Sequence, residues 1–275
     1  MSPILTEPLQ IERVNIAIAN LPSHLVGTKL VQLSDLHYDG KRLSPELLDE
    51  AIALCNQELP DLVLITGDFI TDKPEPIPAL TQKLQQIHSK QGVFGCLGNH
   101  DSSALVRQPL IDSLQKVGIR ILVNEVVYLF DNKIALVGLD DFWSGNFKPK
   151  EVFDSIPSEL SRIVLSHNPD TAKPLAKYSV DLQLSGHTHG GQIVIPGYGA
   201  APAVLGQIRK YAPKAVSDAV PYLKECAAVT KNWHWSEGWH QIGRNQLYVN
   251  RGLGTYFPGR INCPPELTVI TLESF

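Results

Sequence analysis

Short, mostly apolar runs recur along the chain, and each is followed within a few residues by aspartate, asparagine or histidine. Apolar runs of this length that end in turn-forming residues are typical of strands buried in a core. Glycine often stands between the run and the polar residue, which allows the backbone to turn tightly there. The predicted strands cover residues 30–33, 62–65, 92–97, 163–165 and 182–184.

Between the first three runs the apolar residues have the spacing of helices. Ser44 and Pro45 have the sequence of an N-cap and a first helical position, and an apolar face follows them. Two more helices are predicted, at residues 80–87 and at 105–117, the latter starting near Ser103. Strands that alternate with helices predict an α/β sheet with parallel pairing.

The pattern changes after residue 118. Asp131 and Asn132 alone separate two of the strands that follow, and such a pair is typical of a β-hairpin. We therefore expect the second half to contribute a more antiparallel sheet. A strand near the N-terminus is expected at a sheet edge or in an antiparallel pair. These strands cover residues 14–19, 119–122, 126–130, 133–139, 246–250 and 267–272, and residues 71–78 are predicted to form a loop.

The composition limits the classes of protein to consider. Of the 275 residues, 43% are hydrophobic and 19% charged, which is typical of a globular protein with a large core. The net charge of −4 and the lack of a basic block argue against a nucleic-acid-binding surface. The four cysteines are scattered, so no disulfide framework is expected. We see no signal peptide and no transmembrane run, and a cytoplasmic location is the expectation.

The polar residues after the strands have the chemistry of metal ligands. Asp35 and His37 are two positions apart and would point to the same side of a continued strand, so both could approach one ion. His187 and His189 are again two apart and are flanked by glycines. Imidazole, carboxylate and amide oxygen together suit Mn²⁺, Zn²⁺ or Fe. Seven candidate ligands are too many for one tetrahedral ion, whereas one bridging carboxylate would let them fill two sites. The candidates are Asp35, His37, Asp68, Asn99, His167, His187 and His189.

The order of these residues resembles that of the calcineurin-like metallophosphoesterases. That family carries the blocks DxH, GD, GNH, H and GHxH in this order. Here they are Asp35-Leu36-His37, Gly67-Asp68, Gly98-Asn99-His100, His167 and Gly186-His187-Thr188-His189, with no substitution. The GHTHGGQ form and the segments at residues 250–254 and 262–266 resemble the YaeI/YkuE-like phosphodiesterase branch.

The resemblance implies a four-layer α-β-β-α sandwich of two mixed sheets flanked by helices. Two divalent ions are implied, one held by Asp35, His37 and His189, the other by Asn99, His167 and His187, with Asp68 bridging them. A metal-bound hydroxide would attack phosphorus in line. His100 is implied to be catalytic, as a proton donor or a stabiliser of charge. Asp101 could orient His100 or cap a helix, and both roles stay open.

Several other polar residues have weaker claims to a role. Asp140 and Asp141 are expected to be turn or capping residues, with substrate contact as the lesser alternative. Arg251 could contact a phosphate or form a surface ion pair. The remaining histidines, His24, His88, His234 and His240, are expected at the surface or in packing.

We expect one domain over residues 1–275, with a helical, tryptophan-rich insertion at about residues 197–245. Helices are predicted in it at residues 203–211 and 216–230, and Trp233, Trp235 and Trp239 follow. The insertion could cap the site and help to select the substrate, although tryptophans are more often core.

The function expected is hydrolysis of a phosphodiester or pyrophosphate bond in a phosphorylated small molecule or a lipid-linked substrate. One alternative is a pyrophosphatase for a lipid-linked sugar nucleotide of the UDP-diacylglucosamine type, peripherally associated with a membrane. A non-catalytic metal-binding scaffold is an alternative of another class. The complete set of ligand residues argues against the scaffold.

Overall fold

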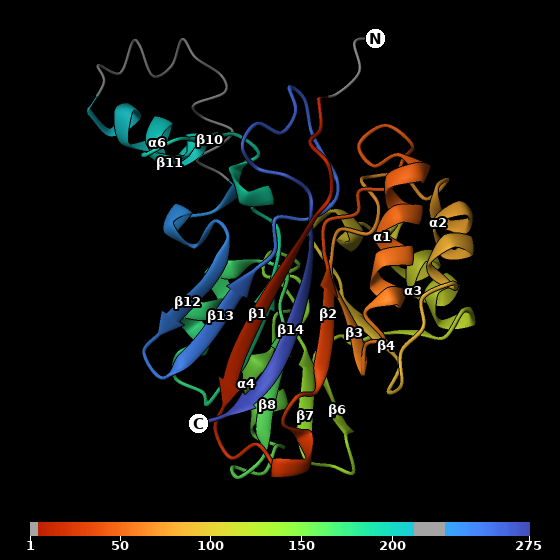
Figure 1. The fold of residues 1–275 in the computed structure, drawn as a ribbon, viewed down its shortest axis with the longest axis vertical. Helices are drawn as coiled ribbons and strands as arrows, with labels where there is room; N and C mark the ends of the chain where they lie inside the picture. Colours follow the sequence, from red (N-terminus) through yellow and green to blue (C-terminus); the bar gives the residue numbers. More distant parts are fainter. Residues whose placement is uncertain (1–4, 212–228) are drawn as a thin grey trace.

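The computed structural model describes residues 5–211 and 229–275, and two six-stranded sheets form its centre (Figure 1). The first sheet has the order β1-β14-β2-β3-β4-β5 and the second the order β12-β13-β9-β8-β7-β6. The strands of the first are β1 (Gln10–Ile18), β14 (Glu266–Ser274), β2 (Lys29–Leu33), β3 (Leu62–Thr66), β4 (Val93–Cys96) and β5 (Ile119–Ile121). Those of the second are β12 (Gly238–Ile242), β13 (Asn245–Val249), β9 (Leu182–Ser185), β8 (Ser161–Leu165), β7 (Ile134–Gly138) and β6 (Glu125–Leu129).

The pairing confirms the parallel sheet and corrects part of the prediction for the second half. Strands β2 to β5 pair in parallel, β14 pairs antiparallel with β2, and β1 lies at the sheet edge, parallel to β14. Strand β5 pairs with β4, so it completes the first sheet and does not begin the second. In the second sheet the predicted hairpin β6–β7 and the pair β12–β13 are antiparallel, but β7, β8, β9 and β13 pair in parallel. Antiparallel pairing is therefore confined to its two edges.

The helices connect these strands and follow the predicted pattern. Helix α1 (Pro45–Gln57) begins after Ser44, whose hydroxyl accepts a hydrogen bond from the backbone N–H of Leu47 at 3.1 Å. Helix α3 begins later than predicted, after a 3₁₀ turn, η2 (His100–Ser102). Among the described residues no helix is both long and apolar enough to cross a membrane. The other helices are α2 (Ile77–Leu84), α3 (Arg107–Lys116), α4 (Pro149–Phe153), α5 (Ala172–Leu175) and α6 (Ala201–Tyr211).

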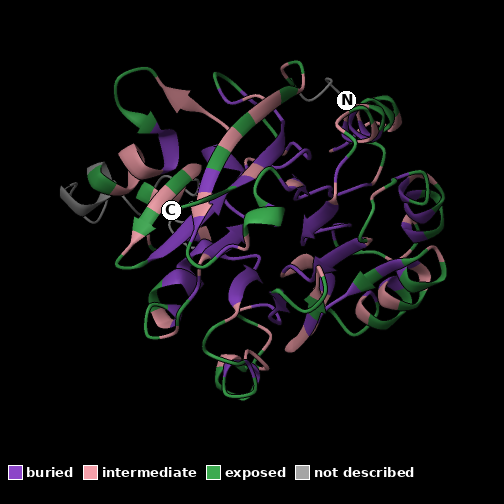
Figure 2. Cartoon of the chain, turned by 60° about the horizontal axis from the view of Figure 1, so that its bottom comes forward, coloured by how far each residue is buried: buried purple, intermediate pink, exposed green. Residues whose placement is uncertain are grey.

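Three apolar cores show that the predicted four layers are present. Helices α1, α2 and α3 cover one face of the first sheet, where Val31 and Val63 point (Figure 1). The neighbouring residues Leu30 and Leu62 point the other way and pack against the second sheet. The far face of that sheet packs on Phe153 and other residues of α4 and α5. The inner strands are accordingly buried, whereas the edge strands β1 and β12 and the outer faces of the helices are partly exposed (Figure 2).

The predicted insertion is described only in part. The helix expected at residues 203–211 is present as α6, preceded by the short strands β10 (Val194–Ile195) and β11 (Gly199–Ala200). The helix expected at residues 216–230 falls almost wholly outside the described residues. The three tryptophans lie in η5 (Trp233–Trp235) and in β12.

A buried arginine holds the loop between β13 and β14, which we call the C-terminal loop (residues 250–265). The side chain of Arg260 is fully buried, and its hydrogen bonds go to uncharged oxygens. Its guanidinium donates to the backbone carbonyls of Arg251, Gly252 and Gly254 at 2.7 to 3.0 Å, and to that of His189 at 3.4 Å. One side chain therefore fixes several turns of this loop against the residues that follow β9.

We predict that Arg260→Met lowers the free energy of unfolding by at least about 3 kcal/mol, because several buried carbonyls lose their donor at about 1–3 kcal/mol each. Urea denaturation of the full chain measures this. Arg13→Met is the matched control, since Arg13 makes an exposed ion pair with Glu58, worth less than about 1 kcal/mol. Equal losses in the two variants would contradict the assignment of Arg260 as the anchor of the loop.

Candidate metal centre

The predicted ligands lie together because strands of both sheets end at one cavity. Asp35 and His37 follow β2, Asp68 follows β3, and Asn99 follows β4 in the first sheet. The second sheet contributes the histidines that follow β8 and β9. Within each sheet these ligand-bearing strands run parallel to one another, so their carboxyl ends meet at one edge. The cavity there has a volume of about 440 Å³.

The backbone at these positions has a conformation that side-chain-bearing residues rarely adopt. Asp35, His37, Asp68, His187 and His189 all have positive φ, between 41° and 71°. The left-handed region costs a residue with a Cβ atom about 1 kcal/mol or more. Strain of this kind concentrates at functional sites, where the surrounding structure imposes it. Here it turns consecutive polar side chains out of the strand direction and into the cavity.

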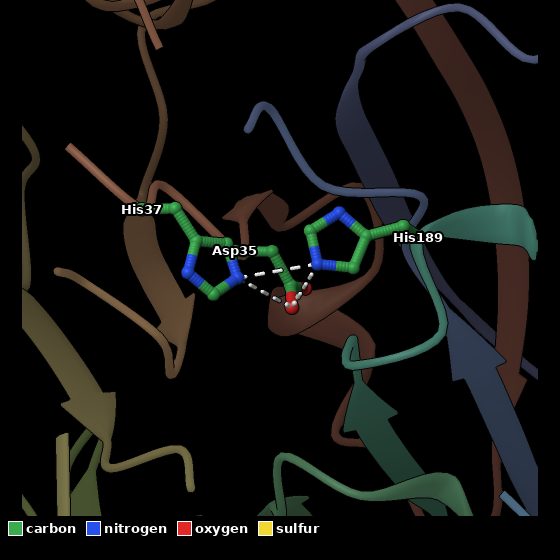
Figure 3. Close-up of side chains that lie close together, drawn as sticks. All are labelled: Asp35, His37 and His189. Carbon is green, nitrogen blue, oxygen red and sulfur yellow. Dashed lines mark hydrogen bonds and ion pairs between the residues drawn. The ribbon is translucent and has the colours of Figure 1, made fainter. Parts of the chain in front are cut away.

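One group of ligands comprises Asp35, His37 and His189, which converge in Figure 3. The Nε2 atoms of the two histidines are 3.2 Å apart. Oδ1 of Asp35 lies 3.4 Å from Nε2 of His189 and 3.9 Å from Nε2 of His37. Three donor atoms from two sheets thus face one point.

A second group comprises Asp68, His167 and His187. Oδ2 of Asp68 lies 3.1 Å from Nε2 of His167 and 3.4 Å from Nε2 of His37 in the first group, so this carboxylate stands between the two. Asn99 lines the same cavity, and its buried Oδ1 has no hydrogen-bond partner among the described residues. An unpaired buried oxygen is costly unless something binds it.

The outer hydrogen bonds of the histidines fix which ring nitrogen faces the cavity. Nδ1 of His167 lies 2.7 Å from the carbonyl oxygen of Thr66, Nε2 of His187 lies 2.7 Å from that of Val229, and Nδ1 of His189 lies 3.1 Å from that of Gly254. A carbonyl only accepts, so each of these nitrogens carries the hydrogen. The other nitrogen of each ring then presents a lone pair, as metal-binding histidines do.

The lone pairs of His167 and His187 face each other at 3.2 Å, between Nε2 of the first and Nδ1 of the second. Two lone pairs at this distance repel unless a positive charge lies between them. Together with the carboxylate of Asp68 and the unpaired oxygen of Asn99, this donor set fits a divalent cation.

The pKa shifts agree with a centre that requires positive charge. Burial lowers the pKa of His37 and of His189, and lowers that of His187 to about 4, so these rings are neutral ligands at neutral pH. Burial alone would lower the pKa of His167 too, but the charge of Asp68 outweighs it and raises this pKa to about 10. Without a metal ion, His167 therefore holds a second proton on Nε2 beside Asp68 at neutral pH, and a divalent cation would take the place of that proton.

Glycines leave room for the two carboxylates. A Cβ atom on Gly98 would lie 2.2 Å from Oδ1 of Asp68, and one on Gly186 would lie 2.2 Å from Oδ2 of Asp35. Real Cβ contacts are essentially never so short. The glycines of the GNH and GHxH blocks are therefore required by packing against the ligands of neighbouring strands.

The ring of His100 lies at the wall of the cavity. Its Nδ1 lies 3.0 Å from Oδ1 of Asp72, and its backbone N–H donates to Oδ1 of Asp68 at 2.9 Å. Asp72 lies in the predicted loop, and nothing in its sequence context distinguished it from an ordinary acidic loop residue.

Asp101 has neither of the two expected roles. Its buried carboxylate accepts hydrogen bonds from the backbone N–H groups of Phe69, Ile70 and Gly98 at 2.9 to 3.3 Å. It does not contact the His100 ring, and it lies within η2 without capping a helix. Burial, and then the charge of Asp68, raise the pKa of Asp101 to about 7. It ties the loops after β3 and β4 together.

Asp140 and Asp141 have structural partners. Asp140 pairs with Arg107 at 2.9 Å, and Asp141 accepts from the backbone N–H of Trp143 as a turn residue. Of the two roles considered for Arg251, the structure shows the ion pair: its guanidinium pairs with Glu12, Glu237 and Glu266.

Several aromatic residues that the sequence analysis did not single out line the cavity. Trp143, Tyr256 and Phe257 border it, together with Val229. Trp233 borders it as well, in the segment for which the sequence left open both a core position and a cap over the site. Trp143 lies in the loop after β7, and Tyr256 and Phe257 lie in the loop after β13, for which the sequence holds no periodic pattern.

Known proteins with similar sequences match this chain over most of its length. The family model described as calcineurin-like phosphoesterase matches residues 28–191, which include all seven predicted ligands. Phosphodiesterase YaeI of Escherichia coli (strain K12) is 30% identical over 97% of this chain and 90% of its own. The metallophosphoesterase YkuE of Bacillus subtilis (strain 168) is 34% identical over 98% and 87%. UDP-2,3-diacylglucosamine pyrophosphatase LpxG of Chlamydia trachomatis is 28% identical over 98% and 93%.

We predict that Gly98→Ala removes metal binding, because its Cβ atom would displace the carboxylate of Asp68. Elemental analysis of protein loaded with Mn²⁺ and desalted should give less than half the metal content of the unaltered chain. Gly206→Ala is the matched control, since nothing lies within 4 Å of a Cβ atom at that position. Full metal content in the Gly98 variant would show that the packing of Asp68 does not depend on this glycine.

Proposed function

We propose, since the chain belongs to the calcineurin-like phosphoesterase family, that its Asp/His centre hydrolyses a phosphodiester or pyrophosphate bond. The chain is a metal-dependent phosphoester hydrolase. One observation supports two ions more than any other. Two groups of imidazole nitrogens turn their lone pairs inward, and the carboxylate of Asp68 stands between them.

The ligand sets follow from this arrangement. Asp35, His37 and His189 would hold one divalent ion, Asn99, His167 and His187 the other, and Asp68 would bind both. The mixture of nitrogen and oxygen donors suits Mn²⁺, Zn²⁺ or Fe. When bound, the ions would supply the Lewis acidity that polarises a phosphate and acidifies a water molecule.

His100 is the residue proposed to act on the leaving group. Its ring is partly exposed in the cavity, while Asp72 holds Nδ1 and so directs Nε2 away from that carboxylate. The hydrogen bond from its backbone N–H to Oδ1 of Asp68 holds the residue beside the proposed metal ligands. From this place it could protonate a departing oxygen or stabilise the charge that develops on it.

The cavity wall supports a substrate with an apolar group. Trp143 packs edge-on against His187 with ring centroids 4.9 Å apart, and half of its surface is exposed. Val229, Trp233 and Phe257 continue this apolar lining beside the ligands. A lipid-linked sugar nucleotide is the second candidate substrate, supported by the likeness to the pyrophosphatase LpxG. Peripheral contact with a membrane surface would accompany such a substrate.

We predict that His100→Ala lowers kcat by about 100- to 10,000-fold, the usual contribution of a positioned proton donor. The assay is hydrolysis of bis(p-nitrophenyl) phosphate by metal-stripped protein with Mn²⁺ or Zn²⁺ added back. Metal content should stay unchanged, because the ring is not among the proposed ligands. His88→Ala is the control, because His88 is exposed and does not line the cavity. Unaltered turnover in the His100 variant would exclude the role proposed for it.

We predict that Trp143→Ala lowers kcat/KM at least about tenfold for dodecyl p-nitrophenyl phosphate, from the loss of apolar surface that covers the chain. Hydrolysis of the methyl ester should change little, since a methyl group does not reach this wall. Trp239→Ala is the matched control, because Trp239 is equally exposed, at 49% against 50%, but does not line the cavity. The same effect on both esters would contradict an apolar subsite at Trp143.

A further inference from the structure

Tyr256, from the C-terminal loop, lies between a proposed metal ligand and the proposed proton donor. Its hydroxyl oxygen is 3.2 Å from Nδ1 of His37 and 3.4 Å from Nε2 of His100. Its ring meets the ring of His37 edge-on, with centroids 5.0 Å apart. The hydroxyl is thus within hydrogen-bond distance of two functional side chains at once.

The chemistry of the neighbours sets the direction of both hydrogen bonds. When Nε2 of His37 binds an ion, its proton must be on Nδ1, so His37 donates to the tyrosine oxygen. The carboxylate of Asp72 only accepts, so Nδ1 of His100 carries a hydrogen and Nε2 of the neutral ring presents a lone pair. The hydroxyl hydrogen of Tyr256 is then free to donate to the neutral ring of His100. When His100 is protonated, as its proposed role as proton donor requires, Nε2 carries a hydrogen and the tyrosine oxygen is the acceptor.

The surroundings hold this side chain in place. The guanidinium of Arg42 lies over the tyrosine ring at 4.6 Å, and the backbone N–H of Tyr256 donates to the side chain of Gln192 at 2.6 Å. The carbonyl of Gly254, two residues earlier, accepts from His189. Arg260 also donates a hydrogen bond to this carbonyl and so fixes the same stretch of loop. The hydroxyl is therefore presented by a preorganised segment.

We propose that Tyr256 is a positioning residue that ties His37 to His100. Its hydroxyl keeps Nε2 of His37 directed at the ion that Asp35 and His189 share, and it holds the ring of His100 at the cavity wall. The first effect concerns metal binding alone, while the second rests on the proposed function. Without the hydroxyl of Tyr256, one of the two ion sites would bind its ion more weakly and the proton donor would be misplaced, although the side chains of His37 and His100 would both still be present.

The test is Tyr256→Phe, which removes only the hydroxyl and leaves the packed ring. Titration of metal-free protein with Mn²⁺ in competition with a chelating dye should show one of two equivalents bound about 10- to 100-fold more weakly, as is usual when an outer partner of a ligand is lost. Tyr128→Phe, on the edge strand β6, is the matched control and should bind both equivalents as the unaltered chain does. Equal affinities in all three proteins would overturn the metal part of the proposal.

The second readout is a double-mutant cycle on diester hydrolysis at saturating Mn²⁺. Tyr256→Phe should lower kcat with little change in KM, and it should lower kcat much less when His100 is already alanine. Equal losses in both backgrounds would overturn the link to His100. If the unaltered chain hydrolyses no ester, the proposed function fails, whereas the metal titration still decides the role of the tyrosine.

Discussion

The repulsion between histidine lone pairs is the constraint on which the rest of this structure depends. Carbonyl partners hold one proton of His167 and one of His187 on the outer side of each ring, so the two inner nitrogens face each other at 3.2 Å and their lone pairs repel unless a proton or a metal ion lies between them. Such a pair, beside two buried carboxylates, is stable only around positive charge. The fold concentrates negative charge and lone pairs at one point and leaves the compensating charge to a ligand. The outer hydrogen bonds of the histidines thus orient the inner nitrogens toward a bound cation.

The backbone is shaped to make this concentration possible. Strands from two sheets end at one cavity, which brings residues from Asp35 to His189 within a few ångströms of each other. Positive φ angles at the ligands turn the side chains inward, and glycines without a Cβ atom let the carboxylates of one strand pass close to the turn of the next. The strain at these turns is balanced by the packing of two large apolar cores on either side of the first sheet. The stability of the core therefore supports the unfavourable geometry of the site.

The C-terminal loop connects the ligands to the rest of the chain. It supplies the carbonyl that orients His189 and the hydroxyl that reaches His37, and the buried Arg260 fixes it by donating to backbone oxygens. The second ion site has a different outer partner, Val229, which lies at the margin of the tryptophan-rich segment. Each proposed ion site is therefore coupled to a different part of the chain, one to the loop before the last strand and one to the segment that lines the apolar wall.

The sequence by itself determined most of the strands, the parallel pairing of β2 to β5 and the seven candidate ligands. These follow from local patterns: apolar runs of strand length, helical spacing between them, and polar residues at strand ends. The tertiary structure decided what depends on loop paths and on partners distant in sequence. Four features are of this kind: Asp72 rather than Asp101 lies beside His100, Tyr256 lies between two histidines, Arg260 anchors the C-terminal loop, and the centre of the second sheet is parallel. No periodicity encodes a contact such as that between Tyr256 and His37, which are more than two hundred residues apart, because only packing of the complete chain brings them together.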